Sequence, residues 1–271
     1  MEKQIKMKNI NNERNFIDLI SYGLDNYKTL IGLDLPDNLM ERINYWKSKL
    51  HNEDETKAVL NPYFIGYGNP NSELLIFGKE KGFDILNTDQ VILESIENTH
   101  YWNEIVNNRK VHIDLHNFGS PLKPYGGIHD NMRGGETWNL YQKLVNHIHQ
   151  TQERNSFLTH TFLTEFNYMP SKYSPGGVKI DDRRKELLKQ PFFKSFPNIL
   201  LTYRSYDKHN AGLTEELFDV KFVERSKIGR QEYLLYISND TSRKVVLTNQ
   251  LSGSAGWSDQ EILLLANMFK A

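Results

Sequence analysis

Cysteine is absent from this sequence of 271 residues. Its absence excludes disulfide bonds, thiolate zinc sites, iron–sulfur clusters and thiol nucleophiles, and it fits a reducing compartment. No window approaches the roughly 18 apolar residues that a membrane-spanning helix needs. The first residues, MEKQIKMKNINNERN, lack the apolar stretch of a signal peptide. We therefore expect a cytoplasmic protein with no membrane partner.

An excess of charge of one sign is also missing, because 33 basic residues balance 34 acidic residues and the net charge is −1. No global basic field attracts nucleic acid, so a DNA partner would need a local basic patch. The densest basic stretch is either a solvated helix start or a track for phosphates. This stretch comprises Lys172, Lys179, Arg183 and Arg184. No obligate protein partner is evident from the sequence.

Four apolar runs have the pattern of strands that are buried on both faces. Helical patterns separate them, and strands that alternate with helices pair in parallel. We therefore predict a three-layer α/β/α sandwich with a central, mainly parallel sheet of about four core strands. The runs are residues 73–78, 157–164, 198–203 and 243–248, and the helical patterns between and after them are 88–108, 137–150, 181–196 and 257–271.

The remaining segments extend this plan. FDVKFVER and RQEYLLYIS flank residues 226–229 and predict a β-hairpin, and Ser258 with Glu261 predicts a capping box at the last helix. We expect residues 1–271 to form a single domain, with residues 1–60 as a helical N-terminal extension packed on it.

Polar and aromatic residues follow each of the four core strands, as GKEKG, EFNYMPSK, YRSYDKHN and NQLSGS. In open parallel sheets, ligands bind beyond the carboxyl ends of the strands. In the first of these segments, Lys79 and Lys81 flank Glu80, and the two ammonium groups would attract an anion and keep Glu80 ionised. The alternative is a solvated turn whose charges serve solubility.

The segment KVHIDLHNF (110–118) places His112, Asp114 and His116 on one face of an extended chain, where they could bind a metal. No further cluster of ligands accompanies them, so we predict no metal and no cofactor. The loop at 119–136 is rich in glycine, and its Tyr125 is expected to face the substrate.

Four segments, in order, resemble the motifs of the uracil-DNA glycosylase superfamily. They are GYGNPNSELLIFGKEKG (66–82), FLTEFNYMPSK (162–172), RRKELLKQPFFKSFPNILLTY (183–203) and VVLTNQLSGSAGWSD (245–259). The resemblance implies a DNA-base N-glycosylase, a hydrolase that flips a damaged or deaminated base into a pocket and cleaves its bond to deoxyribose.

The resemblance also implies roles for single residues. Glu80 would orient the attacking water, and Glu165 or Asn167 would read the base edge. Gln250 would stand near the position of the family's last-motif His, and Phe83 would stack on the base. The residues implied to bind substrate are Gly78, Lys79, Lys81, Gly82, Phe83, Tyr125 and the phosphate loop Ser252, Gly253 and Ser254.

Two departures from the family pattern affect the expected substrate. Gln250 cannot change its protonation as His does, and Glu165 stands where an amide is usual. A carboxylate would repel the carbonyl edge of uracil and would accept from an exocyclic amine, so uracil is not the expected base. Two alternatives stay open: a catalytically degenerate nucleic-acid- or nucleotide-binding module on the same fold, and an unrelated nucleotide-binding α/β enzyme that uses residues 78–82 as an anion turn.

Overall fold

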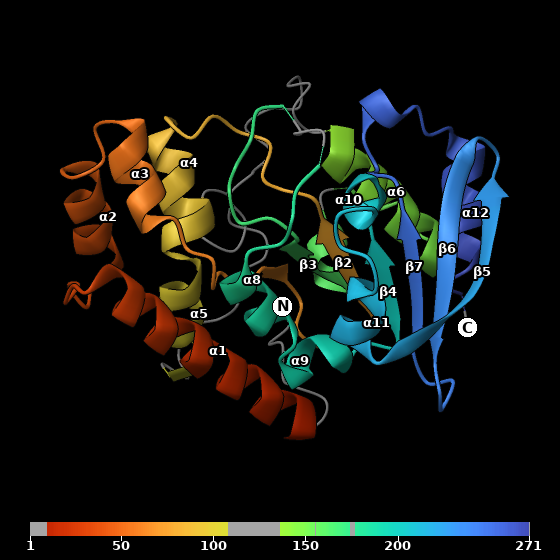
Figure 1. Ribbon diagram of the computed structural model, residues 1–271, viewed down its shortest axis with the longest axis horizontal. Coiled ribbons are helices and arrows are strands. Elements are labelled where there is room, and N and C mark those ends of the chain that lie inside the picture. Colours follow the sequence, from red (N-terminus) through yellow and green to blue (C-terminus); the bar gives the residue numbers. More distant parts are fainter. Residues whose placement is uncertain (1–9, 108–135, 155, 174–176, 271) are drawn as a thin grey trace.

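The structure, a computed structural model, describes residues 10–107, 136–154, 156–173 and 177–270. It is a mixed α/β protein built on a seven-stranded mixed sheet in the order β1-β3-β2-β4-β7-β6-β5 (Figure 1). The strands are β1 (Tyr67–Gly68), β2 (Leu74–Gly78), β3 (Thr161–Glu165), β4 (Asn198–Leu201), β5 (Val220–Ile228), β6 (Gln231–Ser238) and β7 (Lys244–Thr248).

The sheet contains both parallel and antiparallel strand pairs. β2 pairs in parallel with β3 and β4, and β4 pairs in parallel with β7. β1 is antiparallel to β3, while β6 is antiparallel to β7 and to β5. The predicted hairpin is present as β5 and β6, but its turn lies later than expected, because β5 continues to Ile228 and Gly229 adopts a φ of 59°.

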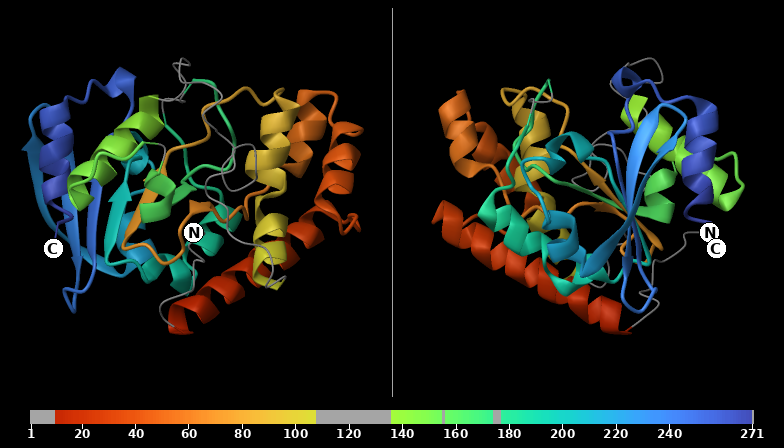
Figure 2. Two further views of the ribbon diagram at one scale, coloured as in Figure 1. Left: turned by 180° about the vertical axis from the view of Figure 1, so that it is seen from behind. Right: turned by 45° about the vertical axis from the view of Figure 1, so that its right-hand side comes forward.

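Alternate residues of the central strands pack to opposite faces of the sheet. On one face, Leu75 and Phe77 join a core with helices α1 (Ile10–Ile31), α5 (Asn98–Asn107), α8 (Asp182–Leu188), α9 (Pro191–Lys194) and α11 (Leu213–Phe218). On the other face, Leu74 and Ile76 pack with α6 (Glu136–His149), α7 (Phe157–His160) and α12 (Asp259–Asn267). Figure 2 shows helices on both sides of the sheet.

Three expected elements differ from the structure. The predicted strand at 157–164 opens with the helical turn α7, so β3 begins only at Thr161. The predicted helix at 88–108 is divided into α4 (Thr88–Val91), a π-helical turn (Ile92–Ile96) and α5. The predicted helix at 181–196 is divided into α8 and α9, because Pro191 lacks a backbone N–H and starts a new helix.

The N-terminal segment supplies α1, α2 (Leu39–Lys47) and α3 (Glu53–Val59). Phe16, Leu19 and Ile20 of α1 belong to the same buried cluster as β2 and β4. Across the described ranges, none of the helices combines the length and apolarity required to cross a bilayer. The expected strand at 110–118 and Tyr125 lie outside the described residues.

Candidate functional site

The carboxyl ends of β3, β2, β4 and β7 lie along one edge of the sheet. The strand register aligns Phe77 with Leu201, and Leu201 with Leu247. Glu80 and Gln250 each follow this row by three residues. Adjacent strands are about 4.8 Å apart, so roughly 10 Å separates the ends of β2 and β7. The segments that the sequence predicts to form one site therefore leave the sheet side by side.

Backbone hydrogen bonds hold the turn at 78–82 against the segment that follows β3. The N–H of Phe166 donates to the carbonyl of Gly78 (2.9 Å), and that of Asn167 donates to Lys79 (2.7 Å). Further on, Ser171 N donates to Lys81 O (2.9 Å). Two parts of the predicted site are therefore fixed to each other along their length.

The turn is not a solvated one, because two of its charged side chains are buried. Glu80 is 6% exposed and Lys81 is 3% exposed. The hydroxyl of Tyr206 donates to Glu80 Oε2 over 2.5 Å, and Lys79 Nζ lies 5.0 Å from the centre of the Tyr206 ring. Tyr206 belongs to α10 (Arg204–Asp207), directly after β4. The sequence marked this segment as a strand end but did not single out Tyr206.

Gly78 leaves room for the side chain of Glu165. The two residues are register partners on β2 and β3, and a Cβ atom at Gly78 would lie 1.9 Å from Glu165 Oε2. Position 78 therefore needs a glycine to make space for Glu165. The resemblance had implied a different reason, namely that Gly78 lets the substrate approach the backbone. Gly82 is exposed, and a Cβ atom there would meet no other described atom within 4 Å.

Glu165 and Lys81 form a buried pair of titratable groups. Burial raises the pKa of Glu165 to about 7 and lowers the pKa of Lys81 to about 7. Within the described residues, neither Glu165 Oε2 nor Lys81 Nζ has a hydrogen-bond partner. The Lys81 amine instead lies 3.2 Å from the centre of the Phe64 ring. Groups perturbed in this way cluster at functional sites.

Arg184 lies near this pair, and it fits neither alternative that the sequence left open for the basic stretch, a solvated helix start or a phosphate track. It is fully buried, and its guanidinium donates to Glu165 O (2.6 Å) and Thr164 Oγ1 (2.7 Å) and also to Phe64 O. Burial lowers the pKa of Arg184 to about 9. Arg184 therefore holds backbone rather than phosphate, and Arg183 binds Asp181 (2.8 Å).

Two other predicted residues have roles within the protein. Asn167 is half-buried, and its Oδ1 accepts from Met169 N (3.1 Å), which closes a local turn. Phe83 is 4% exposed and belongs to the core cluster. Its ring is therefore not presented for stacking on a base.

The loop after β7 lies against the start of α6. The carbonyl of Gln250 accepts from Trp257 Nε1 (3.1 Å), and the hydroxyls of Ser252 and Ser254 are 3.1 Å apart. A Cβ atom at Gly253 would lie 1.9 Å from a carboxylate oxygen of Glu136. A phosphate beside Gly253 would therefore meet a like charge.

Helix α6 also brings Tyr141 to the site. The Tyr141 hydroxyl lies 3.5 Å from Thr202 Oγ1, and Thr202 follows β4. Burial raises the pKa of Tyr141 well above its usual range, and the charge of Glu165 adds to this effect. Tyr141 occupies an apolar helix position, so the sequence offered no signal that separates it from a core residue.

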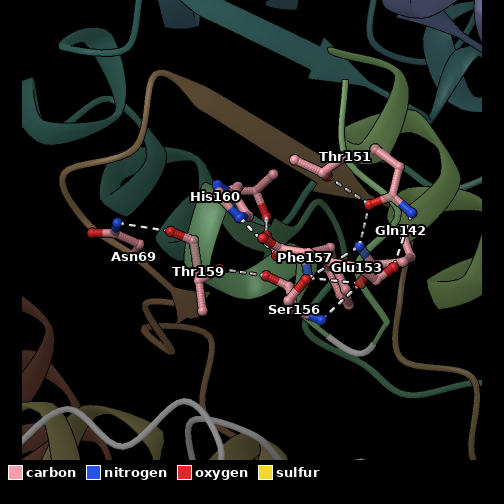
Figure 3. A network of polar contacts seen from close by, with 10 residues as sticks. Asn69, Gln142, Thr151, Glu153, Ser156, Phe157, Thr159 and His160 are labelled. Carbon is pink, nitrogen blue, oxygen red and sulfur yellow. Dashed lines mark hydrogen bonds and ion pairs between the residues drawn. The ribbon is translucent and has the colours of Figure 1, made fainter. Parts of the chain in front are cut away.

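A polar network fixes α6 to the segment before β3 (Figure 3). Gln142 Oε1 accepts from the backbone N–H groups of Ser156 (2.7 Å) and Phe157 (2.9 Å). His160 Nε2 lies 3.1 Å from Glu153 Oε2. Because Glu136 and Tyr141 are on the same helix, the network also helps to fix their positions relative to the carboxyl ends of the strands. No group of three or more potential metal ligands occurs in the part of the chain that the structure describes.

Comparisons of this chain with protein-family models, curated proteins and solved structures find no match. The resemblance to the uracil-DNA glycosylase superfamily therefore stays a prediction, and function has to be inferred from the site.

Proposed function

We propose that this chain is a DNA-base N-glycosylase-like hydrolase with the three-layer fold of the uracil-DNA glycosylase superfamily. In this proposal residues 1–60 form a helical extension on a single domain. Two observations support it: β3, β2, β4 and β7 pair in parallel, and helices pack on both faces of the sheet. Each of the four motif-like segments includes most or all of one of those strands and continues past its carboxyl end, where ligands bind in such sheets.

The observation that carries the proposal is that adjacent parallel strands each place a buried carboxyl group at or just beyond their carboxyl ends. Glu80 follows β2 and Glu165 ends β3, and the charge of Glu80 acts on Glu165. Cleavage of a glycosidic bond builds positive charge on the sugar and is commonly catalysed by two carboxyl groups. Glu80 would hold the attacking water and stabilise that charge, with Tyr206 fixing its carboxylate.

The experiment incubates the protein with oligonucleotides that contain uracil, hypoxanthine, xanthine or alkylated bases, and then treats them with alkali. We expect strand scission with at least one base and a large loss in Glu80→Gln. Glu13→Gln, which changes an exposed carboxylate on α1, is the matched control and should cleave as the wild type does. Scission that is equal in the wild type and in Glu80→Gln on every base would disprove the proposal.

A catalytically degenerate binding module on the same fold is the second candidate, and Gln250 favours it. Its amide cannot change protonation as the His of the family's last motif does. This candidate predicts affinity for DNA or a nucleotide without turnover. A fluorescence titration at low salt that shows no binding of single- or double-stranded DNA would exclude its DNA form.

A further inference from the structure

The surroundings of the Glu165 carboxyl favour its protonated form. The side chain is 9% exposed, and Oε2 has no hydrogen-bond partner within the described residues. The N–H groups of Arg184 are directed at backbone carbonyls and at Thr164 Oγ1, not at this carboxyl. A buried carboxylate oxygen without a donor is costly, so a proton on the group relieves the cost.

Charged groups on two segments face Glu165, and they oppose one another. Lys81 after β2 and Arg184 on α8 favour the ionised carboxylate, while Glu80 disfavours it. Tyr141 on α6 is a neutral neighbour. Burial outweighs these charges and raises the pKa of Glu165 to about 7. The Lys81 amine lies over the Phe64 ring, which leaves Glu165 Oε2 unpaired.

We propose that Glu165 is the general acid of this site and protonates the departing base, so that the site serves bases that leave in protonated form, such as hypoxanthine, in preference to uracil. This inference rests on the proposed glycosylase function. It assigns a proton donor in a site where Gln250 takes the place of a titratable side chain.

The proton and the electron pair balance in one hydrolysis. Glu165 gives its proton to a ring nitrogen of the hypoxanthine, and the C1′–N9 bond breaks with its electron pair passing to the base. Water attacks C1′ and gives a proton to Glu80. The products are free hypoxanthine and an abasic deoxyribose. Exchange with solvent then returns the proton to Glu165 and removes it from Glu80.

The experiment compares two bases in single-turnover excision from otherwise identical duplexes. Hypoxanthine needs a proton to leave, whereas 3-methyladenine already carries a positive charge and needs none. We expect Glu165→Gln to slow hypoxanthine excision by about 100- to 10,000-fold, and to slow 3-methyladenine excision far less. A mixture without protein corrects for spontaneous loss of 3-methyladenine.

A purely structural role for Glu165 predicts equal losses on both bases, and that result would overturn the inference. Unchanged hypoxanthine excision by Glu165→Gln would overturn it too, while the proposed glycosylase function would stand. If the wild type excises no base at all, the proposed function fails and this inference fails with it.

The wild-type pH profile decides the question even if Glu165→Gln does not fold. Hypoxanthine excision should fall about tenfold per pH unit above about pH 7, because only the protonated acid is active. Excision of 3-methyladenine should lack this fall. Identical profiles for the two bases would refute Glu165 as the acid.

Discussion

At the scale of single residues, Gly78 controls the position of a catalytic candidate by lacking a side chain. Gly78→Ala would bring a methyl group to within 1.9 Å of Glu165 Oε2. We expect the free energy of unfolding to fall by about 1–3 kcal/mol, as overpacking of a buried site does. Urea denaturation measures this change.

Gly82→Ala is the matched control, because the added methyl group would meet open space and the backbone φ is not positive. Its effect should stay within about 0.5 kcal/mol. Equal changes in unfolding free energy for Gly78→Ala and Gly82→Ala would show that the position of Glu165 does not require a glycine at residue 78.

Arg184 and Arg183 provide a second test at this scale. Arg184→Met would leave the carbonyls of Phe64 and Glu165 and the hydroxyl of Thr164 without a donor. Each buried unsatisfied group costs about 1–3 kcal/mol, so we expect a loss of at least about 3 kcal/mol. Arg183→Met should cost much less, because that side chain is partly exposed and binds Asp181 on the surface. Thermal or urea unfolding measures both variants. Similar losses of unfolding free energy in Arg184→Met and Arg183→Met would contradict this prediction.

These two arginines also show a limit of prediction from the sequence. They are adjacent in the run DDRRKELL, and nothing in the run separates a buried guanidinium from a solvated one. The sequence did locate Glu80, Lys81 and Glu165 at strand ends that the sheet brings together. It did not reveal their burial, because burial depends on Phe64, Arg184 and α6, which are distant along the chain.

At the scale of elements, the capping box of α12 was predicted and is confirmed. Ser258 Oγ accepts from Glu261 N, and Glu261 accepts from Ser258 N in return. Ser258→Ala should lower the free energy of unfolding by about 1 kcal/mol, since it removes the helix N-cap. Ser21→Ala, on the exposed face of α1, is the control and should have little effect. Chemical denaturation of both variants compares them directly.

Apolar runs located β2, β4 and β7 within a residue or two at their starts, because strands buried on both faces carry few polar residues. The same rule failed at Phe157 and Leu158, which belong to the turn α7. Burial makes these residues apolar in either conformation, so composition alone could not separate helix from strand there. The π-helical turn at Ile92–Ile96 has no pattern of its own in the sequence and was missed.

At the scale of the whole molecule, Glu165 and Lys81 give stability a distinctive dependence on pH. The folded-state pKa of Glu165 is raised from 4.5 to about 7, so its contribution to stability is lost as pH rises through this window. The folded-state pKa of Lys81 is lowered from 10.5 to about 7, so its contribution recovers as pH rises from about 7 to 10.5. The pair therefore contributes least near pH 7.

The double variant Lys81→Met/Glu165→Gln removes both titrations. Its gain in unfolding free energy over the wild type should be greatest near pH 7, where it should reach about 1–4 kcal/mol. Urea unfolding across the pH range measures the gain. Lys57→Met/Glu53→Gln, at an exposed ion pair of 2.6 Å, should show little change at any pH. A gain that does not vary with pH would contradict the assignment.

The sheet order also has a consequence for how the chain is made. β7 lies between β4 and β6, and it pairs with both of them. While a ribosome is still short of residues 244–248, β4 has an open edge and the β5–β6 hairpin has nothing to attach to. The sheet can be completed only near the end of synthesis, so a nascent chain stalled before β7 would expose an unpaired, apolar strand to chaperones and to other chains.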